Sequence, residues 1–261
     1  MFTGLIKTQG TIRRVDQRGD CMMTIALAEP FAIDIGDSIC CQGICLTAVK
    51  VNDNEFKVSL SAESMNRSTA KHWGVGTVIN IEPSLKVGDA MGGHFVSGHV
   101  DGLARVVAAE KSGDSMIWEF EVPPHLSRFI APKGSVTLDG VSLTVNQVKE
   151  SRVESRESSE GAVEKPSPPA GEGWMGGRGF EHARSITPSP QPSPARGEGA
   201  MAYEATAPLD SRLSTLITTF SVNIIPHTAK VTSFGRLKVG ADVNLEIDML
   251  ARYVARLTGA K

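Results

Sequence analysis

Gly36-Asp-Ser-Ile-Cys-Cys-Gln-Gly-Ile-Cys-Leu-Thr-Ala-Val49 is repeated, with substitutions, as Lys133-Gly-Ser-Val-Thr-Leu-Asp-Gly-Val-Ser-Leu-Thr-Val-Asn146. The offset is 97 positions throughout, so that Cys45 stands opposite Ser142. A repeat of this length predicts that one structural unit occurs twice along the chain.

A second repeat has a larger offset of 164 positions. It matches Phe56-Lys-Val-Ser-Leu-Ser-Ala-Glu-Ser64 with Phe220-Ser-Val-Asn-Ile-Ile-Pro-His-Thr228, and residues 75–82 with residues 239–246. The chain is therefore a tandem duplication. Its second copy carries 67 additional residues, the difference between 164 and 97, before Phe220.

Length and composition place the chain among globular proteins. Of the 261 residues, 194 remain when the 67 are set aside, and about 97 per copy is enough for a small β-barrel domain. The net charge is −2 and the Lys and Arg residues are scattered, which argues against a nucleic-acid partner. No apolar run approaches the roughly 18 residues of a membrane span, and no signal-peptide core follows Met1. We expect a cytoplasmic protein without a membrane partner.

All four cysteines lie in the first copy. They are Cys21, Cys40, Cys41 and Cys45. Neither their spacing nor a nearby histidine supplies a tetrahedral metal site, so we expect no metal and mostly structural free thiols.

The first copy has the pattern of short strands. Alternating or β-branched runs are broken by Gly, Asp and Asn, and they cover residues 10–15, 22–27, 39–51, 56–60 and 78–82. The second copy repeats this order. Many short strands within about 90 residues favour a small closed barrel, because closure removes exposed edge strands.

The duplication and its offsets predict three parts. A first barrel covers residues 1–96, and a second covers residues 97–248 with an insert at 152–218. A C-terminal helix covers residues 249–261, with one apolar stripe formed by Leu250, Tyr253, Val254 and Leu257. This stripe is expected to pack on the barrels or on another subunit.

The insert differs in composition from both copies. It holds eight of the fourteen prolines and few large apolar residues, so we expect a disordered segment at a hairpin tip. Gly171-Glu-Gly-Trp-Met-Gly176 has the GxGxxG spacing of a dinucleotide-binding loop. A proline-rich stretch stands where the preceding strand is required, so we reject nucleotide binding there.

The repeated motif Gly-x-Cys/Ser-Leu-Thr carries side chains suited to a ligand. Its Cys or Ser and its Thr are two positions apart on a strand, hence on one face. They fit a heteroaromatic ligand with ring carbonyls and nitrogens, whereas either residue alone is more often structural.

The junction of the copies is a second candidate, because Gly92-Gly-His-Phe-Val-Ser-Gly-His-Val-Asp-Gly102 combines glycines with two histidines. Its latter part repeats residues 2–6 at an offset of 94, which places His99 opposite Leu5. Two similar pockets with unequal roles are therefore expected. His72, His94 and His125 show no such contrast and are expected to be structural or at the surface.

Five blocks together resemble the riboflavin synthase alpha chain and its lumazine-binding relatives. The blocks are Met1-Phe-Thr-Gly4, Gly43-Ile-Cys-Leu-Thr47, residues 92–102, residues 133–145 and Asn223-Ile-Ile-Pro-His-Thr228. The resemblance covers the chain outside about residues 152–218. It implies an all-β fold of two similar six-stranded Greek-key barrels and a C-terminal helix, assembled as a homotrimer.

The resemblance also implies an activity. Two molecules of 6,7-dimethyl-8-(1-D-ribityl)lumazine would react to give riboflavin and 5-amino-6-(D-ribitylamino)uracil, the last step of riboflavin biosynthesis, without a cofactor. The implied active site lies between the first barrel of one subunit and the second barrel of its neighbour. Lumazine synthase is an implied partner.

Carried over position by position, the resemblance implies two pockets. The first contains Gly4, Leu5, Ile6, Cys45, Leu46, Thr47, Ser61, Ala62, Glu63 and Ser64. The second contains Gly98, His99, Val100, Lys133, Ser142, Leu143, Thr144, Ile225, Pro226, His227, Thr228, Ala229 and Lys230.

Catalytic roles are implied for six residues. His99 would shuttle a proton, Ser142 and Thr144 would polarise the ring, and Cys45 or an activated water would add at C7 of the acceptor. Lys133 and Asp139 would orient the substrates or balance charge.

Two other functions fit parts of the pattern. Lumazine proteins share the duplicated barrel and bind the chromophore without reaction, but their second pocket decays, whereas Ser142, Thr144 and His99 are present here. A flavin reductase barrel is disfavoured because no nucleotide domain accompanies it.

Overall fold

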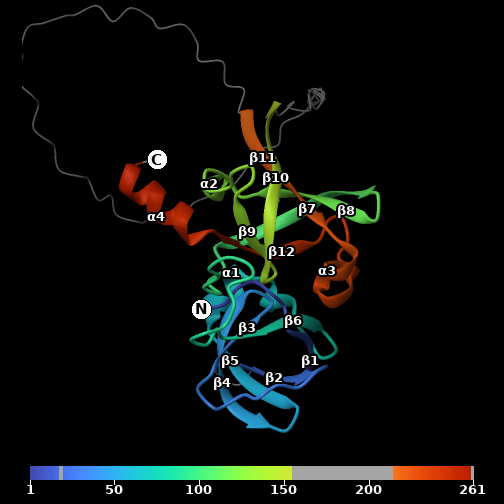
Figure 1. Ribbon diagram of the computed structural model, residues 1–261, viewed down its shortest axis with the longest axis vertical. Helices are drawn as coiled ribbons and strands as arrows, with labels where there is room; N and C mark the ends of the chain where they lie inside the picture. The colour runs from blue at the N-terminus through green and yellow to red at the C-terminus, as the bar shows by residue number, and fades with distance from the viewer. Residues whose placement is uncertain (18–19, 155–213, 260–261) are drawn as a thin grey trace, which may run out of the picture. The chain divides into compact units, whose positions relative to one another are not determined.

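The structure is a computed structural model that describes residues 1–17, 20–154 and 214–259. Its strands form two closed six-stranded barrels, one from each copy (Figure 1). The expected disordered insert lies mostly at residues 155–213, outside the described residues.

The first barrel runs in the order β1-β2-β5-β4-β3-β6 around its wall. Its elements are β1 (Thr8–Asp16), β2 (Cys21–Leu27), β3 (Ser38–Cys41), β4 (Ile44–Asn52), β5 (Glu55–Leu60), the helix α1 (Ala62–Arg67), the 3-10 helix η1 (Thr69–His72) and β6 (Val78–Pro83).

The second barrel has the same succession, β7-β8-β11-β10-β9-β12. Its elements are β7 (Gly102–Ser112), β8 (Ser115–Val122), α2 (Pro124–Ser127), β9 (Ser135–Leu138), β10 (Val141–Glu154), β11 (Ser214–Ile224), α3 (Pro226–Val231), η2 (Ser233–Arg236) and β12 (Asp242–Ile247), followed by the helix α4 (Met249–Thr258). The expected fold class is confirmed.

Alternation of side chains fills the two barrels. Along β2, Met23 and Ile25 point into the first core while their neighbours point outward. The matched residues Phe56 and Phe220 are both fully buried, each in its own core. Each copy therefore closes its own barrel, and burial of apolar surface is the main stabilising contribution.

Short helices follow β5 and β11, at positions for which the sequence pattern predicted no helix. Residues 61–64 begin α1, because the Ser61 hydroxyl accepts a hydrogen bond from the Ser64 N–H and caps the helix. In the second copy Pro226 occupies the first turn of α3, where a missing N–H has no cost.

The C-terminal helix is confirmed and ends slightly earlier than expected. Asp248 caps α4 by accepting a hydrogen bond from the Leu250 N–H, and Gly259 closes it in the left-handed conformation at φ 67°. The predicted stripe does not pack on the barrels, because Leu250, Tyr253 and Leu257 are all exposed.

Strands β10 and β11 extend into the segment expected as insert, residues 152–218. β10 reaches Glu154, and β11 begins at Ser214 and pairs with β8 from Thr218 onward. Both strands continue past the points where the amino-acid composition changes. Composition alone therefore places the ends of the insert a few residues inside the strands.

Matched polar residues join the two barrels. The Asn80 side chain donates to the Asp139 carbonyl (2.9 Å), and the Asn244 side chain donates to the Gln42 carbonyl (2.7 Å). Asn80 matches Asn244, and Gln42 matches Asp139, at the offsets of the repeat. The junction therefore has approximate twofold symmetry.

Among residues 1–17, 20–154 and 214–259, no helix is long and apolar enough to cross a membrane. In the same ranges no three His, Cys, Asp or Glu side chains are grouped as metal ligands would be.

Candidate functional site

Two segments that precede the barrels cross between them. We call residues 2–6 arm one and residues 96–100 arm two. Phe2 and Val96 form an antiparallel bridge where the arms meet. Beyond it each arm continues to the other copy's barrel, since Ile6 packs on the second core and Val100 on the first.

The crossing corrects the expected division of residues between the pockets. Arm one was expected in the first pocket and arm two in the second. In the structure the Gly98 carbonyl accepts a hydrogen bond from the Cys45 N–H (2.7 Å), and the Gly4 carbonyl accepts one from the Ser142 N–H (2.9 Å). Residues of arm one therefore belong with Ser142, and residues of arm two belong with Cys45.

Glycine makes this crossing possible. Gly4 and Gly98 both have φ of +77°, and a Cβ on Gly98 would lie 2.8 Å from the Cys45 nitrogen. A Cβ on Gly4 would lie 2.6 Å from the Ser142 nitrogen. Only glycine combines this backbone conformation with so close an approach.

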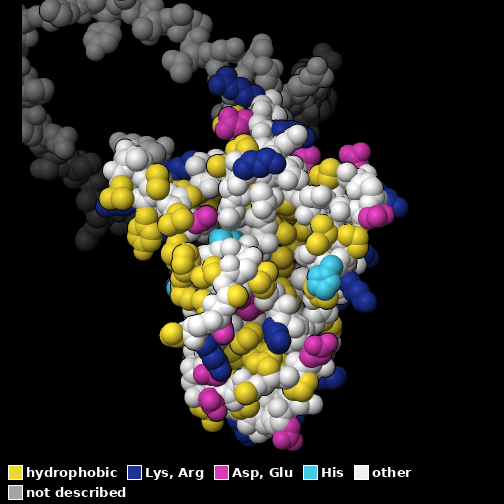
Figure 2. Space-filling model, in the orientation of Figure 1, with side chains coloured by type: hydrophobic (Ala, Val, Ile, Leu, Met, Phe, Trp, Pro, Cys, Tyr) yellow, Lys and Arg dark blue, Asp and Glu magenta, His cyan; other side chains and the backbone are white. Residues whose placement is uncertain are grey.

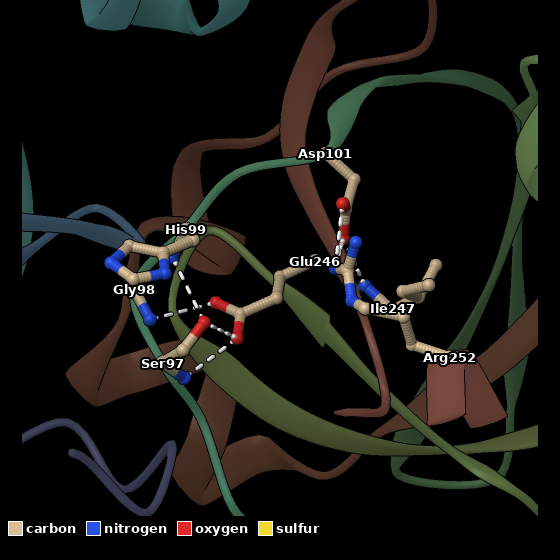
Figure 3. A network of polar contacts seen from close by, with 7 residues as sticks. All are labelled: Ser97, Gly98, His99, Asp101, Glu246, Ile247 and Arg252. Atoms are coloured by element: carbon tan, nitrogen blue, oxygen red, sulfur yellow. Dashed lines mark hydrogen bonds and ion pairs between the residues drawn. The ribbon is translucent and has the colours of Figure 1, made fainter. Parts of the chain in front are cut away.

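A buried carboxylate holds each arm in place. Glu246 accepts hydrogen bonds from the Ser97 N–H (2.6 Å), the Ser97 hydroxyl (2.7 Å) and the Gly98 N–H (2.9 Å), as Figure 3 shows. Glu82 does the same for Thr3 and Gly4. Burial raises the pKa of the Glu246 carboxyl and of the Glu82 carboxyl, although the hydrogen bonds oppose the shift.

Asp101, the residue that follows arm two, ties it to the C-terminal helix. The Arg252 guanidinium of α4 forms an ion pair with Asp101 (2.7 Å), and Asp101 accepts from the Ile247 N–H (Figure 3). The position of His99 is therefore coupled to β12 on one side and to α4 on the other.

The first site is a cavity of about 310 Å³ beside Cys45. Its walls come from β4, α1 and arm two, and they comprise Ile44, Cys45, Glu63, Ser64, Arg67, Ser68, Gly98, His99 and Val100. The cavity brings together Cys45 and His99, which were expected in different pockets. Cys45 is partly exposed, whereas Cys21, Cys40 and Cys41 are buried.

Burial raises the pKa of the Cys40 thiol well above its usual range, and that of the Cys41 thiol as well. These two side chains lie in the interior as protonated thiols, so Cys45 is the accessible thiol of β3 and β4 among the described residues.

Two side chains that were expected to bind the substrate point away from the sites, because side chains alternate along a strand. Leu46 and Leu143 point into the barrel cores, with 4% and 9% exposure. Their neighbours Thr47 and Thr144 are exposed on the outer face. The two leucines therefore pack in the cores, on the inner face of the strands that carry Cys45 and Ser142.

The second site centres on Ser142 and a histidine that was expected to be structural. His94 Nδ1 lies 2.7 Å from the Ser142 hydroxyl, and its Nε2 lies 3.1 Å from the hydroxyl of Thr137. Burial lowers the pKa of His94, so the imidazole is neutral near pH 7, and the negative charge of Asp248 partly opposes this shift. The signal available in the sequence was the Gly92-Gly93 pair, since a Cβ on Gly93 would lie 3.0 Å from the Ser142 hydroxyl.

The other expected residues of the second site lie in two places. Lys133 is exposed at the turn before β9, with φ of 66° and its N–H donating to the Val145 carbonyl. Ile225, Pro226, His227, Thr228, Ala229 and Lys230 form the cap and first turns of α3, the counterpart of α1.

Asp139 is not beside either set of reactive groups. It is 3% exposed in the junction of the barrels, where it accepts from the Asn244 N–H (2.9 Å). Burial raises its pKa to about 7, and hydrogen bonds from Asn244, Gln42 and Ser233 oppose this shift. A buried carboxyl with this environment joins the barrels, in contrast to the expected catalytic role.

Sequence comparison identifies the family. The lumazine binding domain matches residues 3–84, 97–161 and 213–248. The riboflavin synthase of Brucella abortus (strain 2308) is 34% identical over 98% of this chain and 98% of that protein. The riboflavin synthase of Photobacterium phosphoreum is 32% identical over 98% of this chain and 88% of its own length.

Solved structures agree with the fold. LumP complexed with 6,7-dimethyl-8-(1'-D-ribityl) lumazine has a TM-score of 0.59 at 16% identity, covering 95% of this chain and 99% of that chain. LumP complexed with riboflavin has a TM-score of 0.61 over the same shares. At this identity the likeness concerns the fold alone. Taken with the matched domains and the curated relatives, the chain belongs to the lumazine binding domain family and is an enzyme of its riboflavin synthase branch.

Proposed function

We propose that the protein converts two molecules of 6,7-dimethyl-8-(1-D-ribityl)lumazine into riboflavin and 5-amino-6-(D-ribitylamino)uracil. A four-carbon unit leaves one molecule and is added to the other. Because one substrate molecule supplies what the other gains, the reaction balances without an external oxidant or reductant. The observation that carries the proposal is the pair of matched sites with different reactive groups, Cys45 with His99 and Ser142 with His94.

The first site offers a thiol and an imidazole on one cavity. His99 is exposed on arm two, so it can exchange a proton with solvent and with a bound ligand. We assign to His99 the transfer of a proton at the C7 methyl group, whose anion is delocalised into the ring. Cys45, or a water beside it, would add at C7 of the acceptor.

The second site offers a hydroxyl already engaged with a neutral imidazole. A hydrogen bond to His94 orients the Ser142 hydroxyl toward a ring carbonyl or nitrogen of the substrate. Thr144, two positions along β10, is exposed on the same face, and Lys133 precedes β9 at the same end. We assign ring polarisation to Ser142 and Thr144, and substrate orientation to Lys133.

Transfer between two bound molecules requires that the two kinds of site face each other. We propose that they do so between neighbouring subunits of a homotrimer in the cytoplasm. Figure 2 shows hydrophobic side chains gathered over α4, and Leu250, Tyr253, Val254 and Leu257 are 59 to 86% exposed. An apolar helix face of this kind is suited to packing against copies of itself. Alignment of the reactants could then lower the barrier by on the order of 7–11 kcal/mol.

A second candidate is a protein that binds lumazine or flavin without reaction. The likeness to LumP supports it, since LumP is seen with both kinds of ligand. The intact hydrogen bonds between Ser142, His94 and Thr137 favour catalysis, because a site that only held a ligand would not need a neutral imidazole on a hydroxyl.

The test is incubation of the purified full-length chain with the lumazine alone, in the presence of a chelator. Riboflavin fluorescence should rise while half of the lumazine is returned as the pyrimidine, and Ser142→Ala should slow this rise more than it weakens lumazine binding. Saturable binding of the lumazine without any riboflavin would establish the second candidate instead.

A further inference from the structure

A row of cations crosses the outer face of the first barrel, away from both candidate sites. In the strand register Lys50 on β4 opposes Lys57 on β5, and Lys57 opposes Thr24 on β2. Thr24 in turn opposes Arg14 on β1. The side chains point outward, because their neighbours Met23, Ile25, Phe56 and Val58 fill the core.

A β-bulge adds a further cation to this row. The register of β1 against β2 shifts between Ile12 and Arg14, so that Arg13 and Arg14 together face Thr24. Both arginines are exposed. The bulge therefore places two guanidinium groups at one end of the row, opposite the two lysines at the other.

The row lines a hollow of about 400 Å³. Its walls comprise Arg13, Arg14, Thr24, Lys50, Asn52, Glu55, Phe56 and Lys57. Among the described residues, no ion pair or hydrogen bond is found for the side chains of Arg13, Arg14, Lys50 and Lys57. Glu55 is the acidic side chain of the lining, so the hollow keeps an excess of positive charge.

The second barrel shows that the architecture does not require these cations. Its matching bulge carries Val107 and Ala108, and Ala108 opposes Glu119, which opposes Ser221. Glu119 is paired with Lys149 (3.4 Å). The two barrels share one fold, but the matching outer-face residues are neutral or ion-paired in the second barrel. In the first barrel the charged residues of this row are cations without an ion pair among the described residues. Directly opposed lysines such as Lys50 and Lys57 repel each other, which an anion bound between them would offset.

We propose that this hollow is a binding site for a small polyphosphate, either an inorganic chain of phosphates or the phosphate end of a nucleotide. Three strand spacings separate Arg14 from Lys50, about 14 Å along the sheet, which long side chains can close around a compact ligand. Guanidinium and ammonium groups form charge-assisted hydrogen bonds with phosphate oxygens, and the Thr24 hydroxyl and Asn52 amide lie on the same lining. The hollow's small volume favours such a ligand over an acidic protein surface.

The experiment is calorimetric titration of the full chain with inorganic tripolyphosphate and, separately, with adenosine triphosphate, at several salt concentrations. We expect saturable, salt-sensitive binding. The double variant Lys50→Gln/Lys57→Gln should weaken it by roughly tenfold for each lysine. The matched control Lys111→Gln/Lys238→Gln removes the same charge elsewhere on the surface and should bind as the wild type does. Riboflavin formation should be unchanged in both variants.

The titrations separate the alternatives. Equal affinity for both ligands assigns recognition to the phosphates alone, and tighter nucleotide binding that the double variant abolishes adds a contact to the organic part. If the control variant weakened tripolyphosphate binding equally, binding would depend only on the overall charge of the protein, and the proposal would be wrong. Binding of polyglutamate without binding of tripolyphosphate would overturn it in favour of an acidic protein partner.

Discussion

At the scale of single residues, the two copies differ in chemistry at position 139 and its counterpart, position 42. Gln42 and Asp139 occupy matched places with φ of 51° and 50°, but only the second can ionise. The pKa of Asp139 is raised from 3.8 to about 7, so the folded state holds this proton more tightly than the unfolded chain. The resulting stabilisation is complete below pH 3.8 and is lost as the pH rises through about 7.

Asp139→Asn should therefore remove much of this pH dependence. Between pH 4 and pH 8 the free energy of unfolding of the wild type should fall, relative to the variant, by up to about 4 kcal/mol. Denaturant unfolding at several pH values measures this difference. Glu82 and Glu246, whose pKa values are also raised, leave a slope of the same sign in the variant. Parallel pH profiles for the two proteins would show that Asp139 stays ionised in the junction.

His94 is the residue whose role the structure changes most. His94→Ala should lower kcat by about 10²–10³-fold with a smaller effect on KM, because the Ser142 hydroxyl loses the hydrogen bond that orients it toward the substrate ring. Because burial lowers its pKa below the usual 6.5, the acid limb of kcat should begin below that pH. Steady-state kinetics across pH check both expectations, with the exposed His125→Ala as control. Wild-type kcat in His94→Ala would show that the Ser142 hydroxyl does not need this hydrogen bond for the reaction.

At the scale of elements, the crossing of the arms is the feature on which both sites depend. Gly98→Ala should destabilise the fold by about 1–3 kcal/mol or more, since it adds strain at positive φ and a Cβ 2.7 Å from that of Cys45. Gly76→Ala is the matched control, because φ is +90° there but no atom lies within 4 Å. Thermal unfolding of both variants isolates the cost of the close approach. Equal losses would mean that backbone conformation alone requires glycine at position 98.

The sequence predicts the elements better than it predicts their crossing. Repeat offsets and alternation are local, so they reveal two barrels, the C-terminal helix and the importance of Cys45 and Ser142. Which barrel receives arm two depends on a bridge between Phe2 and Val96 and on the carboxylate of Glu246, residues far apart in sequence. Likewise the Leu46 side chain belongs to a binding motif but points into the core. His94 was missed because its partners, Ser142 and Thr137, come from β10 and β9.

At the scale of the whole molecule, the second barrel can be tested for its dependence on residues 155–213. The repeat offsets of 97 and 164 carry the pair Asn52 and Glu55 of the first barrel to Lys149 and Thr219. Continued in the same antiparallel register, positions 154 and 214 are expected opposite each other. In the first barrel Asn52 and Glu55 are opposed in this way across two residues. Replacing residues 155–213 by Asp-Asn should therefore give a stable enzyme, since loop closure depends only weakly on length.

The measurements are thermal unfolding, sedimentation and riboflavin formation by the shortened chain. Unchanged or higher stability with retained turnover is expected. Loss of turnover in a well-folded protein of unchanged oligomeric state would assign a role in the reaction to residues 155–213.

The approximate twofold symmetry of the junction has a consequence for how the two halves could diverge. A symmetric pair of identical chains joined through the same contacts would carry every substitution twice, once on each side of the axis. Joining both halves in one chain lifts that constraint. Leucine can stand at position 5 while histidine stands at 99, and glutamine at 42 while aspartate stands at 139. Covalent linkage thus lets one ancestral pocket become two specialised ones without disturbing the contacts that hold them together.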